Sequence, residues 1–257
     1  MELNLDNKKV LITGASRGIG LSIAEGFLKE KAKTCIVSRG SDNLYKNEKK
    51  LQDMYGSENL FATNCDCTNL NSLNMLKHKI EEKWGHLDIV IVNVGDGRSS
   101  SEPLPNNEIW GKIWDKNFES ALNTSRVFLP MLEASNGCLL FISSIAGVES
   151  IGAPTDYSTA KAAIIALSKN LSKKLAPNVR VNVIAPGNVY FKGGSWDEKI
   201  QKDKNKIQKI VKSSVPMNRF ATTEEISHSA VFLCSDRASF ITGSVLVIDG
   251  GQTSGFC

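Results

Sequence analysis

Residues 8–20 read KKVLITGASRGIG, a short apolar run that leads directly into glycines at positions 14, 18 and 20. The run predicts a buried strand, and glycine permits a tight turn with positive φ and a close approach of backbone to ligand. Apolar residues then recur at helical spacing over residues 18–30. A helix that begins at such a turn presents unpaired N–H groups that can hold an anionic pyrophosphate. Strand, turn and helix together favour a dinucleotide site over a purely structural turn, although the spacing differs from G-x-G-x-x-G.

Strand and helix patterns alternate along the rest of the chain. We expect strands at residues 8–13, 34–38, 60–64, 87–93, 138–143, 179–185 and 245–248, and helices at residues 18–30, 44–54, 70–84, 109–133 (one or two), 155–175 and 222–233. This alternation predicts an α/β fold, a Rossmann-type doubly wound parallel sheet with helices on both faces. No Pro/Ser-rich linker divides the chain, so we expect one domain over residues 1–257. Residues 188–215 break the alternation of strands and helices with a long Lys-rich stretch, which indicates a flap on the substrate side.

Composition excludes several classes of function. The 257 residues are 41% hydrophobic and 23% charged, with a net charge of +4. This is ordinary globular usage without a polybasic arm, so we expect no nucleic-acid partner. The N-terminus lacks the apolar run of a signal peptide, and no stretch approaches about 18 uninterrupted apolar residues. We therefore expect a cytoplasmic protein with no membrane partner.

The cysteines are scattered. They stand at positions 35, 65, 67, 138, 234 and 257, several within expected strands, which indicates reduced, mostly buried thiols. Cys65 and Cys67 have no second Cys or His pair at ligand spacing, so we predict no metal site.

The second expected strand bears on the choice of cofactor. It ends Val37-Ser38-Arg39, without the carboxylate that binds a ribose 2′-hydroxyl in many dinucleotide folds. Arg39 and Arg17 have the guanidinium geometry that suits a 2′-phosphate. The pattern favours NADP(H), with NAD(H) as the open alternative.

Tyr157 and Lys161 stand four residues apart at the start of the Ala-rich helix expected over 155–175. That spacing places both on one helix face, where an ammonium favours the phenolate and lowers the tyrosine pKa. A shift of ~3 units needs roughly 4 kcal/mol, which Lys161 and a positively charged nicotinamide would share. Tyr157 would then exchange a proton with a substrate oxygen near neutral pH. Ser143 and Ser144 end the preceding strand, where open α/β sheets bind ligands.

With these residues in place, the chain resembles the short-chain dehydrogenase/reductase family over essentially its whole length. The resemblance rests on Thr13-Gly-x-x-x-Gly-x-Gly20, Asp66-Cys-Thr68, Val92-Asn-Val-Gly95, Asn117, Ser144, Tyr157-x-x-x-Lys161, Pro186-Gly187 and Asp249-Gly-Gly251. Ser144 precedes Tyr157 at the spacing that the family expects, so we assign Ser144 rather than Ser143.

The resemblance implies a role for each site residue. Tyr157 would be the general acid/base, Lys161 would lower its pKa and bind the nicotinamide ribose, Ser144 would orient the substrate oxygen, and Asn117 would hold a proton-relaying water. Asp66 would contact the adenine, and Asn93 and Gly95 would line the cofactor cleft. The full expected cofactor set is Gly14, Ser16, Arg17, Gly18, Ile19, Gly20, Ser38, Arg39, Asp66, Cys67, Asn93, Gly95, Tyr157, Lys161, Pro186, Gly187 and Val189. Members of the family are commonly homotetramers and sometimes homodimers.

The chain departs from the family pattern in three places. Val92-Asn-Val-Gly95 replaces Asn-Asn-Ala-Gly and is followed by Asp96-Gly-Arg98. Phe191 stands where the family has a carboxamide-binding Thr, a contact that the backbone of Val189 would have to supply. The flap carries seven lysines between Lys192 and Lys212 against three acids, a charge that suits an anionic substrate or a solvated helix face.

The leading hypothesis is therefore an oxidoreductase that interconverts a carbonyl and a secondary alcohol on a polar small molecule such as a sugar derivative. A 3-oxoacyl-carrier-protein reductase is the enzymatic alternative. A dinucleotide-binding sensor or scaffold without turnover is the alternative from another class.

Overall fold

The computed structural model describes residues 2–255. Its centre is a seven-stranded parallel sheet in the order β3-β2-β1-β4-β5-β6-β7. The strands are β1 (Lys9–Thr13), β2 (Lys33–Ser38), β3 (Leu60–Asn64), β4 (Ile89–Val92), β5 (Cys138–Ile142), β6 (Arg180–Pro186) and β7 (Val245–Ile248). The chain builds outward from β1 to β3 and then returns to the other side of β1 at β4. Ligands bind at the carboxyl ends of the strands where the order reverses in this way.

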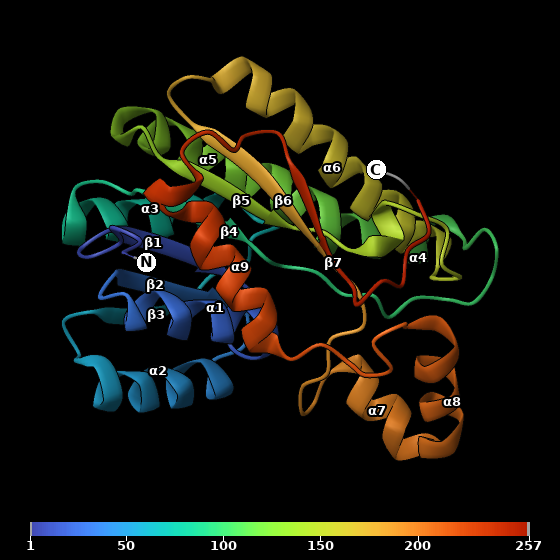
Figure 1. Ribbon diagram of the computed structural model, residues 1–257. Helices are drawn as coiled ribbons and strands as arrows, with labels where there is room; N and C mark the ends of the chain where they lie inside the picture. The colour runs from blue at the N-terminus through green and yellow to red at the C-terminus, as the bar shows by residue number, and fades with distance from the viewer. Residues whose placement is uncertain (1, 256–257) are drawn as a thin grey trace.

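Helices cover both faces of the sheet (Figure 1). They are α1 (Gly18–Lys29), α2 (Asp42–Tyr55), α3 (Leu70–Trp84), α4 (Asn107–Trp114), α5 (Ser120–Ser135), α6 (Thr155–Leu175), α7 (Ser195–Lys202), α8 (Lys204–Ser214) and α9 (Thr223–Cys234). Buried side chains of α1, α2 and α9 form one hydrophobic cluster with the sheet, and those of α3, α5 and α6 form the other. The predicted α/β fold class is confirmed.

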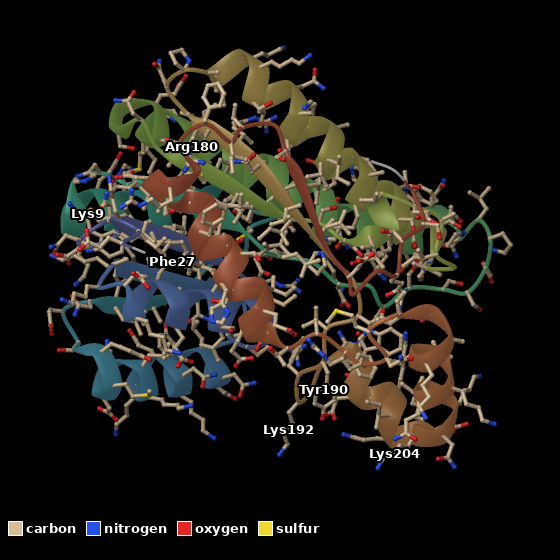
Figure 2. The ribbon with its side chains drawn as sticks, in the orientation of Figure 1. Lys9, Phe27, Arg180, Tyr190, Lys192 and Lys204 are labelled. Carbon is tan, nitrogen blue, oxygen red and sulfur yellow. The ribbon has the colours of Figure 1, made fainter. Side chains whose placement is uncertain are left out.

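The alternation of side chains along β1 creates these two layers. Val10 and Ile12 belong to one cluster and Leu11 to the other, and all three are 0% exposed. Successive strand residues point to opposite faces, so a sheet covered on both sides requires an unbroken apolar run. Phe27 of α1 is also fully buried and lies between helix and sheet (Figure 2). Burial of such a side chain stabilises the fold by about 1.5–3 kcal/mol.

The segment expected to hold one or two helices over 109–133 forms α4 and α5, joined by a π-helical turn at Asp115–Glu119. A π-turn inserts one extra residue into a helix, and such turns are frequent at functional sites. The expected strand at 87–93 is shorter, at Ile89–Val92.

The flap, residues 188–215, contains α7 and α8, which project away from the sheet (Figure 1). Ile207, Val211 and Val215 form a small hydrophobic cluster with the partly buried Trp196, Ile200 and Phe220. This cluster contains no residue of the two large layers. Among the described residues, the flap therefore has a hydrophobic core of its own.

Within residues 2–255, no helix has both the length and the hydropathy to cross a membrane, and no group of acidic, His or Cys side chains is placed to hold a metal ion. Five cysteines are buried free thiols, namely Cys35, Cys65, Cys67, Cys138 and Cys234. Cys257 lies outside the described residues.

Candidate active site

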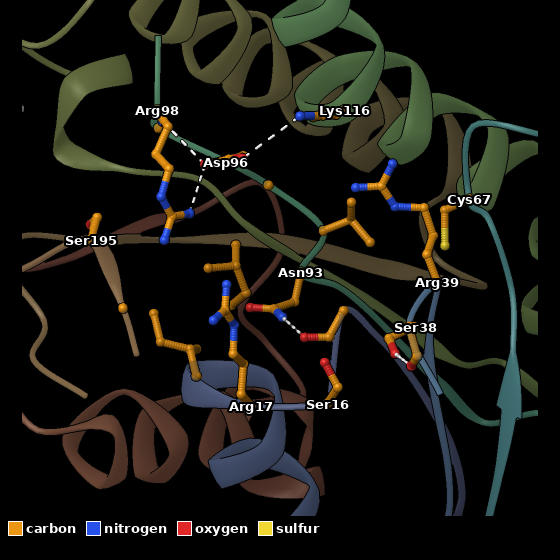
Figure 3. A pocket seen from close by; sticks show the side chains of 18 of the residues that line it. Ser16, Arg17, Ser38, Arg39, Cys67, Asn93, Asp96, Arg98, Lys116 and Ser195 are labelled. Atoms are coloured by element: carbon orange, nitrogen blue, oxygen red, sulfur yellow. Dashed lines mark hydrogen bonds and ion pairs between the residues drawn. The ribbon is translucent and has the colours of Figure 1, made fainter. Parts of the chain in front are cut away.

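A cavity of about 510 Å³ opens at the carboxyl ends of the central strands, where the strand order reverses. Of the residues expected from sequence, its wall contains Gly14, Ser16, Arg17, Ile19, Ser38, Arg39, Asp66, Cys67, Asn93, Gly95, Tyr157 and Lys161. Figure 3 shows Ser38, Arg39 and Cys67 on one side of the pocket and Arg98 and Ser195 on the other. The pocket therefore extends from the end of β2 to the flap.

The glycine turn after β1 is built for close approach. Gly14 and Gly18 have φ of 64° and 59°, in the left-handed region that favours glycine. A Cβ on Gly20 would lie 2.5 Å from Nδ2 of Asn93. Arg17 is the N-cap residue of α1, and a guanidinium has no acceptor atom for the first N–H groups of the helix. The turn thus suits the phosphates of a dinucleotide.

Asn93 ties the end of β4 to this turn. Its Nδ2 donates to the carbonyl oxygens of Thr13 and Gly14 at 3.1 and 3.0 Å, and its backbone N–H donates to Oγ1 of Thr13 at 3.0 Å. The expected cleft-lining role of Asn93 is therefore accompanied by a structural one, because its side chain holds the turn in place.

The end of β2 carries Ser38 and the exposed Arg39. The hydroxyl of Ser38 donates to the carbonyl of Gly40 at 2.7 Å. Asp66 accepts hydrogen bonds from the backbone N–H and the hydroxyl of Thr68 at 3.0 and 2.8 Å, and both residues belong to the pocket wall.

The side chain of Arg17 differs from expectation. Its Nη1 donates to the carbonyl of Gly193 in the flap at 2.8 Å, so the guanidinium faces the flap instead of joining Arg39 around one phosphate. This contact could not be predicted from the sequence, because the carbonyl that Arg17 meets belongs to a residue 176 positions away.

The two serines after β5 have different surroundings. The hydroxyl of Ser143, 5% exposed, donates to the carbonyl of Lys161 at 2.9 Å, which fastens α6 to the end of the strand. The hydroxyl of Ser144 accepts from the N–H of Ala146 at 3.1 Å and lies close enough to the Tyr157 phenol to favour a lower pKa of that group. Ser143 contributes to the pocket wall, but only Ser144 of the two interacts with the Tyr157 phenol.

Tyr157 and Lys161 both lie on α6, and the Lys161 ammonium is 5.8 Å from the centre of the Tyr157 ring. Burial raises the pKa of Tyr157 above its ordinary value, opposed by the hydrogen bond to Ser144 and assisted by the nearby charge of Asp96. Burial also lowers the pKa of Lys161 to about 8. Burial disfavours the charged form of each group, which opposes the expected lowering of the Tyr157 pKa. That lowering, which Lys161 would share with a positively charged nicotinamide, stays a prediction.

Asn117, fully buried in the π-helical turn, clamps the segment after β4. Its Nδ2 donates to the carbonyls of Asp96 and Ile113 at 3.0 and 2.9 Å, and its Oδ1 accepts from the N–H of Asp96 at 3.1 Å. A Cβ on Gly95 would lie 2.8 Å from Nζ of Lys161 and 3.0 Å from Oδ1 of Asn117. Asn117 and Lys161 therefore flank Gly95 directly.

Some expected residues are not among those that line the pocket. They are Gly18, Gly20, Asn117, Ser144, Pro186, Gly187 and Val189. Gly187 packs so closely that a Cβ there would meet the Cα of Asp249 at 2.8 Å.

The pocket wall also contains residues that were not predicted from the sequence, among them Asp96, Arg98, Lys116, Phe191, Gly194 and Ser195. Asp96 forms ion pairs with Arg98 at 3.1 Å and Lys116 at 3.7 Å. The ring of Phe191 lies over the glycine turn, 2.7 Å from the position of a Cβ on Gly18. The sequence does mark two of these places as unusual, through Asp96-Gly-Arg98 and through Phe191 in place of Thr. Neither pattern indicates which residues these side chains contact in the folded protein.

Comparison with known proteins agrees with this geometry. Residues 14–253 match the family described as enoyl-(acyl carrier protein) reductase. A 3-oxoacyl-[acyl-carrier-protein] reductase, FabG, of Chlamydia muridarum is 36% identical over 251 residues, covering 96% of this chain and 98% of that protein. The short-chain dehydrogenase/reductase SDRA of Arabidopsis thaliana is 32% identical, covering 97% and 96%.

The crystal structure of L-sorbose reductase from Gluconobacter frateurii, complexed with NADPH and L-sorbose, superposes with a TM-score of 0.93 at 29% identity and covers all of both chains. With this agreement in sequence, fold and site, the chain belongs to the short-chain dehydrogenase/reductase family of oxidoreductases.

Proposed function

We propose that this protein uses NADP(H) to interconvert a carbonyl and a secondary alcohol on a polar small molecule such as a sugar derivative. One observation carries the proposal. Tyr157 and Lys161, with Ser144 close to the Tyr157 phenol, line the same pocket as the glycine turn, Ser38 and Arg39. The pocket thus has room for a dinucleotide and a proton donor beside it.

In the direction of reduction, the Tyr157 hydroxyl donates its proton to the substrate oxygen as the carbonyl carbon is reduced. A raised pKa keeps the phenol protonated and ready to act as the acid. Ser144, close to the Tyr157 phenol, orients the same oxygen. Lys161 then favours the phenolate that remains, because an ammonium near an anion stabilises it. NADPH, when bound, supplies the hydride, and the protein supplies orientation and the proton.

Asn117 completes the catalytic set. It fixes the backbone at Asp96 and lies beside Gly95 and Lys161. Both hydrogens of its amide are used by carbonyls, so a proton-relaying water would donate to Oδ1. The proton lost by Tyr157 would return from solvent through Lys161 and this water.

The preference for NADP(H) rests on Arg39. It is exposed at the end of β2, beside Cys67 in Figure 3, and a guanidinium fits a phosphate with two parallel hydrogen bonds. Gly14, Ser16, Gly18, Ile19 and Gly20 would cradle the pyrophosphate, with Asp66, Cys67, Asn93 and Gly95 along the cleft. Arg17, Pro186, Gly187 and Val189 complete the proposed cofactor set.

The polar character of the substrate rests on the charged side chains near Tyr157. Asp96 influences the pKa of Tyr157 and pairs with Arg98 and Lys116. Charged and hydrogen-bonding groups at this end favour a substrate with several hydroxyls over an apolar one.

A 3-oxoacyl-carrier-protein reductase is the second candidate, favoured by the charge of the flap. Its acids are engaged, since Asp197 accepts from Tyr190, Glu198 pairs with Arg98, and Asp203 caps α8. Its seven lysines, at 192, 199, 202, 204, 206, 209 and 212, take part in no ion pair among the described residues. Lys192 and Lys204 extend outward in Figure 2, a charge that would attract an acidic carrier.

Steady-state assays of the purified protein test the proposal. NADPH oxidation, followed by absorbance, is measured with a panel of ketoses and with a short 3-oxoacyl thioester, and each is repeated with NADH. We expect turnover with at least one ketose and a preference for NADPH. A preference for the thioester would favour the carrier reductase, and cofactor binding without turnover on either class would favour the sensor.

We further propose that residues 1–257 form one domain, with the flap 188–215 on the substrate side, and that the protein is a cytoplasmic homotetramer or homodimer. The ring of Phe240 is fully exposed in one chain, an apolar surface that an assembly would cover. Light scattering of the purified protein tests the oligomeric state.

A further inference from the structure

The flap is joined to the rest of the protein by two adjacent chain segments. Val189 and Ala221 form an isolated parallel bridge. The N–H of Tyr190 donates to the carbonyl of Ala221 at 3.0 Å, and the N–H of Ala221 donates to the carbonyl of Asn188 at 2.9 Å. Beyond this base the flap has its own hydrophobic cluster, formed by α7, α8 and Phe220.

The start of the flap is internally braced. The carboxylate of Asp197 accepts from the hydroxyl of Tyr190 at 2.9 Å, the N–H of Gly193 at 2.8 Å and the amide of Gln201 at 3.1 Å. Residues 190–201 are therefore held together as one unit that includes Phe191.

Two polar contacts join this unit to other parts of the pocket wall. Arg98 donates from Nη2 to Oε1 of Glu198 at 2.6 Å and from Nε to Oε2 at 3.2 Å, a two-point contact between segments 100 residues apart. Arg17 donates to the carbonyl of Gly193. Both Arg17 and Arg98 line the pocket.

The Arg98 side of the contact is anchored to the catalytic region. The side chain of Asp96 accepts from the backbone N–H and from Nη1 of Arg98, both at 3.1 Å. The backbone of Asp96 is in turn held by Asn117. A continuous set of hydrogen bonds therefore runs from Asn117, beside Lys161, to Glu198 on α7.

We propose that Arg98 and Glu198 form a clamp that holds the flap over the substrate end of the pocket and so positions Phe191 against the glycine turn. Arg98 and Glu198 are positioning residues, since they act through the placement of the flap. The inference rests on the proposed carbonyl-reducing function and names the contact that completes its substrate site.

The clamp is suited to opening. Its two side chains are 41% and 51% exposed, and exposed ion pairs contribute little to the stability of the fold. Within the described residues, the hydrophobic cluster of the flap is separate from both large layers. The flap can therefore tilt about its paired base without breaking a core, which admits substrate when the clamp opens.

The test compares Glu198→Ala and Glu198→Gln with wild type. Glu108→Ala is the matched control, since it removes an exposed carboxylate paired at 2.6 Å with Lys112, on α4. Two readouts are taken, namely hydrogen exchange of the backbone amides of residues 190–202 without substrate, and KM and kcat for the best ketose at several salt concentrations.

We expect Glu198→Ala to speed exchange in residues 190–202 and to raise KM by roughly 2- to 5-fold, the size typical of an exposed ion pair, with kcat little changed. Glu198→Gln should fall between it and wild type, and Glu108→Ala should match wild type. Added salt should raise the KM of wild type towards that of Glu198→Ala.

Faster exchange of residues 190–202 with an unchanged KM would show that the ion pair is merely structural, and would overturn the clamp. A raised KM with unchanged exchange, or no change in either quantity, would overturn it as well. A wild-type protein without turnover on any carbonyl would instead overturn the proposed function. In that case the exchange data alone decide whether Glu198 holds the flap.

Discussion

The ammonium of Lys161 donates a hydrogen bond to the carbonyl oxygen of Ile142 at 3.2 Å. Ile142 is the last residue of β5, and Lys161 is only 3% exposed. This contact holds the lysine in the buried part of the pocket wall, where one carbonyl compensates only part of its lost hydration. Its low pKa of about 8 follows from that burial.

The buried lysine should make stability depend on pH. The unfolded chain holds this proton up to a pKa of about 10.4, whereas the folded protein releases it near pH 8. Between these values the unfolded state binds more protons, so stability rises with pH. We expect Lys161→Met to be more stable than wild type at pH 7 by up to roughly 3 kcal/mol, with the gain disappearing towards pH 10.

Urea denaturation of both proteins at several pH values between 7 and 10 measures this difference. Lys173→Met, which replaces an exposed lysine on the same helix, is the control and should show no such trend. A gain for Lys161→Met that stayed constant with pH would contradict a lowered lysine pKa.

Replacement of Gly95 should damage the site more than replacement of Gly97. A Cβ at position 95 would lie 2.8 Å from Nζ of Lys161, whereas one at position 97 would lie 3.5 Å from the Tyr157 ring, an ordinary contact. We expect Gly95→Ala to displace Lys161 or Asn117 and to lower kcat at least about tenfold, since a misplacement of about 1 Å costs up to 100-fold. Gly97→Ala should stay within a few-fold of wild type.

The test measures kcat of Gly95→Ala and Gly97→Ala, with circular dichroism to verify that both variants fold. Equal kcat values in the two folded variants would show that the packing of Gly95 against Lys161 has no bearing on the reaction.

Tyr157→Phe removes the proposed proton donor and little else. The expected loss of turnover is about 10²- to 10⁴-fold, the contribution of a positioned general acid. Binding of NADPH, followed by its fluorescence, should persist because the glycine turn and Arg39 are untouched. Turnover close to that of wild type would mean that another group donates the proton.

Arg39→Ala should weaken NADPH more than NADH. A hydrogen bond to a charged group is worth about 1.5–3 kcal/mol, so the Kd for NADPH should rise roughly 10- to 100-fold, with little change for NADH. Titration of the variant and wild type with each cofactor measures the ratio. If the wild type accepts both cofactors equally and the variant changes neither, the 2′-phosphate does not contact Arg39.

Much of the fold follows from local patterns in the chain. The apolar run at 8–13, the glycines at 14, 18 and 20 and the alternation of strand and helix each depend on near neighbours, because side-chain periodicity and backbone freedom are local properties. The four-residue spacing of Tyr157 and Lys161 likewise places both on α6 without knowledge of the rest of the protein.

Only the tertiary structure decided the surroundings of these residues. The partners of Arg98 and Arg17 in the flap are 100 and 176 residues away, a distance over which sequence periodicity carries no information. The packing of Phe191 over Gly18 and the opposite pKa shifts of Tyr157 and Lys161 depend on burial, which arises when distant segments pack together. The sequence thus determined which chemical groups this protein has, and the packed structure decided which of them meet.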